Sequence, residues 1–154
     1  MICTLSACGA STRASHEAAP ASPQNLSPEA QCLANTASAG AVPADAPSRV
    51  TVSHILIRYS GAKRATDEIT RNRGEACLRA MAALDGLKQG RDFGELAGEM
   101  SDERGAGSRG GSIGSIEVED VEPAFAAAAF ALDINQVSQV VETEFGFHLI
   151  LRSN

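Results

Sequence analysis

The composition of the chain changes abruptly near residue 49, and this change limits how much of the chain can fold into a domain. Residues 1–48 hold five of the six prolines, one basic side chain and three acidic side chains, among mostly small and polar residues. A segment so poor in large apolar residues buries too little surface to offset the entropy lost on ordering it. We therefore expect a disordered Ala/Ser/Pro-rich tail over residues 1–48 and one folded domain over residues 49–154.

One short pattern in the tail bears on where the protein resides. Leu5-Ser6-Ala7-Cys8 resembles a bacterial lipoprotein cleavage box, in which Cys8 would receive the lipid. Only seven residues precede Cys8, whereas a signal peptide needs a charged start and an apolar stretch of ~7–15 residues. Either the true start lies upstream of Met1, or the match is accidental. The first case predicts a protein anchored in the cell envelope by lipid alone, and the second predicts a cytoplasmic protein.

A short helical pattern in the tail and the four cysteines of the chain also bear on the fold. Residues 26–34 can form one or two helical turns, with Ser27 as the N-cap and Pro28 at the first helical position. The cysteines form no CxxC pair and no Cys/His cluster, so we expect neither a metal site nor a disulfide framework. Cys77, within a helical pattern, is expected to be a buried helix residue.

Charge and composition exclude several function classes. The net charge is −6, which argues against a nucleic-acid partner. The chain has no Trp and one Tyr, so platforms for stacking single-stranded bases are largely absent. No apolar run reaches the ~18 residues of a membrane helix.

Hydrophobic periodicity from residue 49 onward predicts an α+β domain. Alternation predicts strands, and apolar spacing of three to four residues predicts helices. The expected elements are a strand at 50–58, a helix at 70–89 capped by Thr70, a second helix from Asp92-Phe93, a glycine-rich loop at 101–112, a strand at 113–118, a helix from Pro123, and strands at 137–142 and 147–152.

Six short motifs in this order resemble the parvulin family of peptidyl-prolyl cis–trans isomerases. They are Ser53-His54-Ile55-Leu56, Phe93-x-x-Leu96-Ala97, Ser101-Asp102, Gly110-Gly111-Ser112-Ile113-Gly114, Phe125-x-x-x-x-Phe130-Ala131-Leu132, and Thr143-x-Phe145-Gly146-Phe147-His148-Leu149-Ile150. The resemblance covers residues 49–154. It implies a parvulin fold, with a four-stranded, mainly antiparallel sheet surrounded by helices. It also implies a monomeric enzyme that acts on proline-containing polypeptides without a cofactor.

The chemistry of prolyl isomerisation fits such a domain. Rotation about the peptide bond faces a barrier of ~18–20 kcal/mol and breaks no covalent bond. An apolar slot for the proline ring and a few fixed polar groups therefore suffice. By resemblance, Ile113, Val121 and Phe125 would line the slot, with Val121 at a position where many members have Met.

The resemblance also assigns polar roles. His54 and His148 match a histidine pair beneath the pocket, which could share a proton and orient nearby hydroxyls such as that of Thr143. The alternative is that the pair only stabilises the fold. Glu103 stands where parvulins commonly carry Cys or Asp facing the substrate amide, in a loop about one residue longer than usual. It keeps the negative charge of an Asp, but its greater length could place it slightly off this position or leave it solvated and idle.

Three cations after the first strand suggest a substrate preference. Arg58, Lys63 and Arg64 match the basic cluster of Pin-type parvulins, which predicts an acidic or phosphorylated residue before proline. The alternative is a solvated surface cluster, since Asp67 and Glu68 adjoin it. A parvulin-fold chaperone with little isomerase activity is the second functional hypothesis.

A dinucleotide-binding enzyme is the third hypothesis. Residues 105–110 fit the pattern G-x-G-x-x-G. A dinucleotide site needs a strand before this pattern and a helix after it, whereas here the expected order is reversed.

Overall fold

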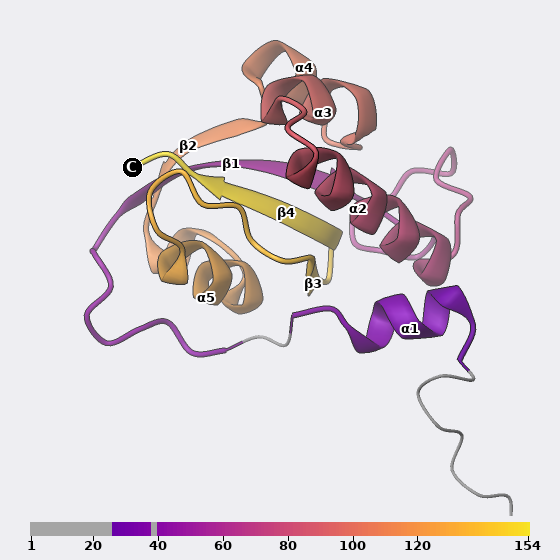
Figure 1. The fold of residues 1–154 in the computed structure, drawn as a ribbon, viewed down its shortest axis with the longest axis horizontal. Helices are drawn as coiled ribbons and strands as arrows, with labels where there is room; N and C mark the ends of the chain where they lie inside the picture. Colours follow the sequence, from indigo (N-terminus) through magenta and orange to yellow (C-terminus); the bar gives the residue numbers. More distant parts are fainter. Residues whose placement is uncertain (1–25, 38–39) are drawn as a thin grey trace, which may run out of the picture.

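A four-stranded antiparallel sheet forms the centre of the computed structural model, which describes residues 26–37 and 40–154. The spatial order of the strands is β2-β1-β4-β3, and the two long strands β1 and β4 lie in the middle (Figure 1). The strands are β1 (Val50–Ile57), β2 (Ser112–Ile116), β3 (Val141–Thr143) and β4 (Gly146–Arg152). The helices are α1 (Pro28–Ala34), α2 (Arg73–Lys88), α3 (Phe93–Met100), α4 (Ala106–Arg109) and α5 (Pro123–Ala131), with a short 3₁₀ helix, η2 (Val118–Asp120).

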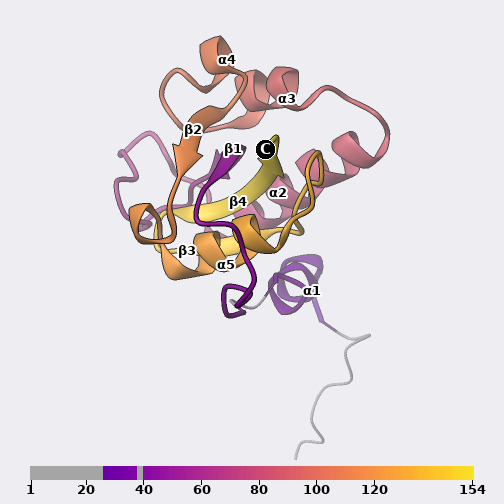
Figure 2. The same cartoon turned by 90° about the vertical axis from the view of Figure 1, so that its left-hand side faces the viewer.

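Helices cover both faces of this sheet, so its central strands are buried on both sides (Figures 1 and 2). Ile55 and Ile57 of β1 point to one face, where they pack with α2 and α3. Val50 and Val52 point to the other face, where they pack with α5. Because side chains alternate along a strand, His54 lies on the α5 side. The sheet therefore separates a core beneath α2 and α3 from the side on which the histidines lie.

The expected α+β class and the four-stranded sheet are confirmed, and several element boundaries differ. The expected glycine-rich loop at 101–112 contains the short helix α4, and β2 covers Ser112–Ile116 rather than 113–118. Helix α2 begins after Asn72 rather than Thr70, because Asn72 and Glu75 form a reciprocal capping box. Strand β3 covers only Val141–Thr143, and Val137 reaches the sheet only through an isolated bridge to Leu151. The expected helix from Asp92-Phe93 is present as α3, with Asp92 as its N-cap, and Pro123 begins α5 as expected.

The segment before the domain differs from the expectation of a linker. Helix α1 has the expected Ser27 cap and Pro28 start, but it is packed against α2 through a Cys32–Cys77 disulfide. Cys77 is buried as expected, whereas its bond to Cys32, 45 residues away, was not expected. The amide of Ala37 also donates to the carbonyl of Val140, 2.9 Å away. A covalent crosslink thus holds a segment whose composition alone would not order it.

The proposed lipidation site Cys8 and the rest of residues 1–25 lie outside the described residues. No helix in the described part of the chain is long and apolar enough to span a membrane.

Candidate active site

Seven residues expected to form the site line one cavity of about 420 Å³ on the α5 side of the sheet. They come from all four strands, from the loop after β1, from the segment between β2 and α5, and from α5. The seven are His54, Arg64, Ile113, Val121, Phe125, Thr143 and His148. Residues far apart in the sequence therefore meet at one concave surface.

The register of the two central strands places the histidines side by side. Leu56 of β1 pairs with His148 of β4, and His54 pairs with Ile150, so both imidazoles project from the same face. Their rings stack with centroids 5.4 Å apart. Phe125 presents its ring edge-on to both, with centroids 5.8 Å from His54 and 5.3 Å from His148. Since Phe125 is only 4% exposed, these contacts fix the floor of the cavity.

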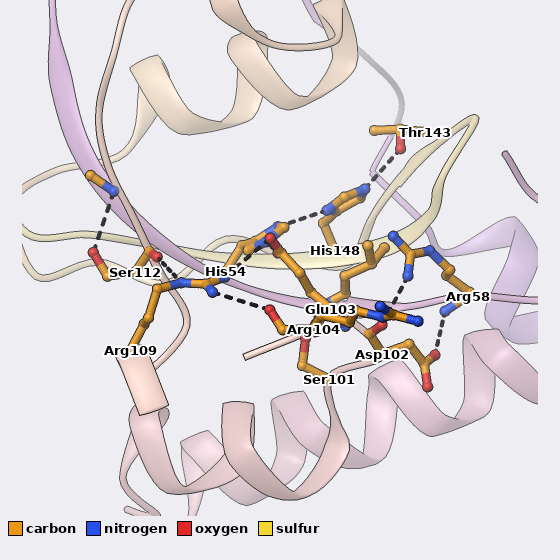
Figure 3. A network of polar contacts seen from close by, with 12 residues as sticks. His54, Arg58, Ser101, Asp102, Glu103, Arg104, Arg109, Ser112, Thr143 and His148 are labelled. Carbon is orange, nitrogen blue, oxygen red and sulfur yellow. Dashed lines mark hydrogen bonds and ion pairs between the residues drawn. The ribbon is translucent and has the colours of Figure 1, made fainter. Parts of the chain in front are cut away.

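A chain of polar contacts runs from Thr143 through both imidazoles to Glu103 (Figure 3). The Thr143 hydroxyl lies 2.8 Å from Nε2 of His148, and Nδ1 of His148 lies 3.2 Å from Nδ1 of His54. Nε2 of His54 contacts a carboxylate oxygen of Glu103. A carboxylate can only accept, so His54 donates to it, and a neutral His54 must then accept from His148. His148 in turn accepts from Thr143.

Burial and charge set the protonation of two members of this chain. Burial of His148, with the nearby charges of His54 and Arg58, lowers its pKa well below the usual value, so its imidazole is neutral at pH 7. The hydrogen bond from His54 lowers the pKa of the Glu103 carboxyl, and Arg109 and Arg58 act in the same direction. The chain thus joins a neutral imidazole to an ionised carboxylate.

Glu103 lies at the margin of the site. It does not line the proline-sized cavity but lies against His54. It does line two neighbouring cavities, and its side chain is 29% exposed. Its carboxylate therefore acts on the histidine pair rather than facing the main cavity.

The three expected cations have different surroundings. Arg58 donates from Nη1 to the carbonyl of Asp102 at 2.8 Å. Lys63 forms an ion pair with Glu144 and lies over the ring of Phe145. Arg64, held at a positive φ of 60°, lines the cavity beside His54. The structure therefore brings only one of the three cations to the wall of this cavity.

Sequence reasoning missed several residues around the site. The segment that contains η2 lines the cavity with three carboxylates, Glu119, Asp120 and Glu122. Phe145 lies in a quoted motif but was not assigned to the pocket, which it also lines. Arg109 was hidden inside the glycine pattern, whose context is a short helix between α3 and β2. No group of three or more metal-binding side chains occurs among the described residues.

The arrangement favours holding an apolar ring against Phe125, beside a fixed chain of hydrogen-bonding groups. Thr143 is the member of that chain whose hydroxyl lies at the cavity wall. Rotation about a peptide bond requires positioning and electrostatic stabilisation rather than bond cleavage. The geometry provides both requirements.

Comparison with known proteins identifies similar domains. Residues 41–153 match the family model described as "PPIC-type PPIASE domain". The chain is 36% identical over 113 residues to the protein dodo of Drosophila melanogaster, covering 70% of this chain and 68% of that protein. It is 33% identical over 117 residues to "Peptidyl-prolyl cis-trans isomerase Pin1" of Malus domestica, covering 70% of this chain and 96% of that protein.

Other relatives are longer. The chain is 37% identical over 103 residues to "Chaperone SurA" of Methylococcus capsulatus, where the match covers 67% of this chain and only 21% of that protein. Among solved structures, the peptidyl-prolyl isomerase ESS1 from Candida albicans superimposes with a TM-score of 0.66 at 31% identity. That match covers 73% of this chain and 66% of the solved chain.

Proposed function

The chain belongs to the PPIC-type family of peptidyl-prolyl cis–trans isomerases, and we propose that its substrates are unmodified polypeptides outside the cytoplasm. Its activity is the isomerisation of Xaa-Pro peptide bonds in proline-containing polypeptides. The composition of the cavity wall supports the proposed substrate class, and the disulfide supports the compartment.

In the proposed mechanism, the proline ring sits on Phe125 between Ile113 and Val121. Holding the ring while the preceding residue rotates lets the site favour the twisted amide over either planar form. The buried chain of His54, His148 and Thr143 supplies a pre-oriented polar wall, which costs no reorganisation during rotation. No proton transfer is needed.

The charge of the cavity wall carries the substrate proposal. One cation, Arg64, and three carboxylates, Glu119, Asp120 and Glu122, line it. A phosphate carries about −1.5 to −2 charges near neutral pH, and it would meet a wall with an excess of carboxylates. Lys63 is already paired with Glu144, so an anion would have to compete for it. We therefore expect a phosphate to give little or no advantage.

Arg64 supports the alternative, a preference for an acidic or phosphorylated residue before proline. Peptides with Ala-Pro, Glu-Pro and phospho-Ser-Pro separate the two cases when kcat/KM is measured at low and high salt. The proposal predicts values within about threefold of each other. A phosphopeptide turned over more than tenfold faster at low salt, with loss of the advantage in Arg64→Ala, would establish the alternative.

A folding chaperone with little isomerase activity is the second candidate, because one relative is named a chaperone. The two candidates differ in their response to Phe125→Ala. An isomerase should lose turnover of Xaa-Pro peptides. A chaperone should suppress aggregation of an unfolded protein that contains no proline equally well before and after the change.

The disulfide supports a location in an oxidising compartment, because such bonds are rare in the cytosol. If Cys8 is lipidated, the protein is anchored to the cell envelope. Cell fractionation, with mass spectrometry of the native protein, tests both points. A lipid adduct on Cys8 and an oxidised Cys32–Cys77 pair in the membrane fraction are expected. A soluble cytoplasmic protein with both thiols free would contradict the proposal.

A further inference from the structure

Arg109 occupies a central position between the histidine chain and the loop that leads into β2 (Figure 3). All three nitrogens of its guanidinium have acceptors. Nε donates to the carbonyl of Ser112 at 3.1 Å, and Nη1 donates to the carbonyl of Arg104 at 3.1 Å. Nη2 lies 3.2 Å from Oε1 of Glu103. The guanidinium therefore ties Glu103 to the start of β2, one residue before the cavity residue Ile113.

Close backbone packing places Arg109 at this point. Helix α4 lies against α3, and a Cβ added to Gly98 would lie 3.2 Å from the Cα of Gly107. A Cβ added to Gly94 would likewise lie 3.2 Å from the Cα of Gly110. Glycines on both sides thus allow α4 to approach α3 closely. The approach fixes the direction from which Arg109 reaches Glu103.

Glu103 is shared between the arginine and the histidine pair. Its Oε1 faces Arg109 and its Oε2 faces His54. The arginine stabilises the ionised carboxylate and limits its rotation, because two oxygens are bound from two directions. A change at Arg109 should therefore be felt by His54 through Glu103.

The histidine chain has two possible hydrogen-bond directions. When His54 carries its proton on Nε2 and donates it to Glu103, Thr143 donates to His148, and His148 donates to His54. When the proton lies on Nδ1 instead, His54 donates to His148, and His148 then donates to Thr143. The Thr143 oxygen also accepts from the amide of Phe145 at 3.1 Å. In the second direction the Thr143 hydroxyl proton is therefore free to point into the cavity.

We propose that Arg109 is a positioning residue that acts through Glu103 to set the hydrogen-bond direction of the His54–His148–Thr143 chain. By holding the carboxylate against Nε2 of His54, it keeps the Thr143 hydroxyl proton directed to His148 and the polar wall of the cavity in one orientation. Among the described residues, the ion pairs of Glu103 are with His54 and Arg109, so Arg109 is the arginine that holds this carboxylate.

The inference rests on the isomerase activity, but its first test needs no substrate. Nitrogen-15 NMR of the histidine side chains reports which ring nitrogens carry protons. Arg109→Gln releases one oxygen of the Glu103 carboxylate, so the share of His54 rings that carry their proton on Nε2 should fall at a fixed pH. Arg109→Lys can still pair with Glu103 and should keep that share near that of the unchanged protein.

The control is Arg91→Gln, which removes an exposed arginine paired with Glu99 on α3. It should leave the histidine spectra unchanged. Identical histidine spectra of the unchanged protein, Arg91→Gln and Arg109→Gln would overturn the inference. An inactive protein with the expected NMR shift would instead overturn the proposed function and leave this inference standing.

Kinetics supply the second test. Because Arg109 does not line the proline cavity but keeps its polar wall in one orientation, Arg109→Gln should lower kcat about fivefold, with KM nearly unchanged. In a Glu103→Gln background the same change should lower kcat by less than twofold, because the intermediary carboxylate is gone. Full, independent effects of the two changes would show that Arg109 does not act through Glu103.

Discussion

Phe125 is the side chain on which the proposed ring pocket depends. Phe125→Ala should destabilise the fold by about 3–5 kcal/mol, because the residue is almost fully buried. It should also lower kcat/KM at least tenfold, measured under conditions where both proteins remain folded. The matched control is Phe130→Ala, which empties a similarly buried site on the same helix but does not line the cavity. Equal activity losses in the two variants would place the pocket elsewhere.

His148 makes stability depend on pH. Its folded-state pKa is lowered by burial, so the unfolded chain binds a proton that the folded protein excludes. The stabilising contribution of neutral His148 is complete at pH values above the unfolded-state pKa of about 6.5. It is lost as the pH falls below that pKa. The free energy of unfolding should decrease between pH 7 and pH 5 by up to about 1.4 kcal/mol per pH unit from this group.

Urea denaturation at a series of pH values checks this prediction. His148→Gln should be less stable at pH 7, because a buried hydrogen-bonding partner is lost. It should also show a shallower dependence on pH. Parallel stability curves for the two proteins would mean that His148 takes up its proton equally well in the folded state.

The junction between α4 and β2 shows how a single glycine joins two elements. Gly111 has a φ of +76°, and its carbonyl accepts from the amide of His54. A Cβ at this position would lie 2.6 Å from the His54 carbonyl oxygen. Gly111→Ala should therefore lower the free energy of unfolding by about 1–2 kcal/mol, because alanine disfavours the left-handed conformation. The collision of its Cβ with the His54 carbonyl should lower it by a further ~1–3 kcal/mol.

Gly90→Ala separates these two costs. Gly90 also has a positive φ, +89°, but no atom lies within 4 Å of its added Cβ. Chemical denaturation should show the smaller, conformational loss alone. Because Gly111 contacts β1 at His54, its variant should also lose activity, whereas Gly90→Ala should remain fully active. Equal stability losses in the two variants would mean that the loop around Gly111 yields without cost.

Elements with a strong local signal could be predicted, and those fixed by distant contacts could not. The alternation in β1 and the Asp92 cap of α3 are properties of neighbouring residues. The start of α2 was harder to predict, because Thr70 and Asn72 are both acceptable N-caps. Only Asn72 has a glutamate, Glu75, three residues later to complete a capping box. The pattern at residues 137–142 predicts a strand, but only its last two residues belong to β3, and Val137 reaches the sheet through an isolated bridge to Leu151.

The site residues differ in the same way between local patterns and distant contacts. His54, His148 and Phe125 belong to recognisable sequence motifs, so it could be predicted that they lie in one cavity. The contact between Glu103 and Arg109 depends on how α4 docks on α3, which no local pattern encodes. The carboxylates of η2 reach the cavity because of the path the chain takes between β2 and α5.

Across the whole molecule, the Cys32–Cys77 bond joins the N-terminal segment to the domain core. Both cysteines belong to the core on the α2 side of the sheet, away from the face that carries the histidines. The bond closes a loop of 45 residues and so lowers the conformational entropy of the unfolded chain. The chain-entropy relation predicts that this stabilises the folded state by about 4 kcal/mol. The bond should therefore govern stability without shaping the catalytic cavity.

The Cys32→Ser/Cys77→Ser double variant tests this division. Its melting temperature should fall by on the order of 10–20 °C in calorimetry, whereas kcat/KM at a temperature where both proteins are folded should change less than twofold. Reductant should lower the melting temperature of the unchanged protein toward that of the variant, and it should not affect the variant. An unchanged melting temperature would show that packing of α1 alone holds the segment. A large loss of activity in the fully folded variant would show instead that α1 communicates with the cavity through the sheet, because the two lie on opposite faces of β1 and β4.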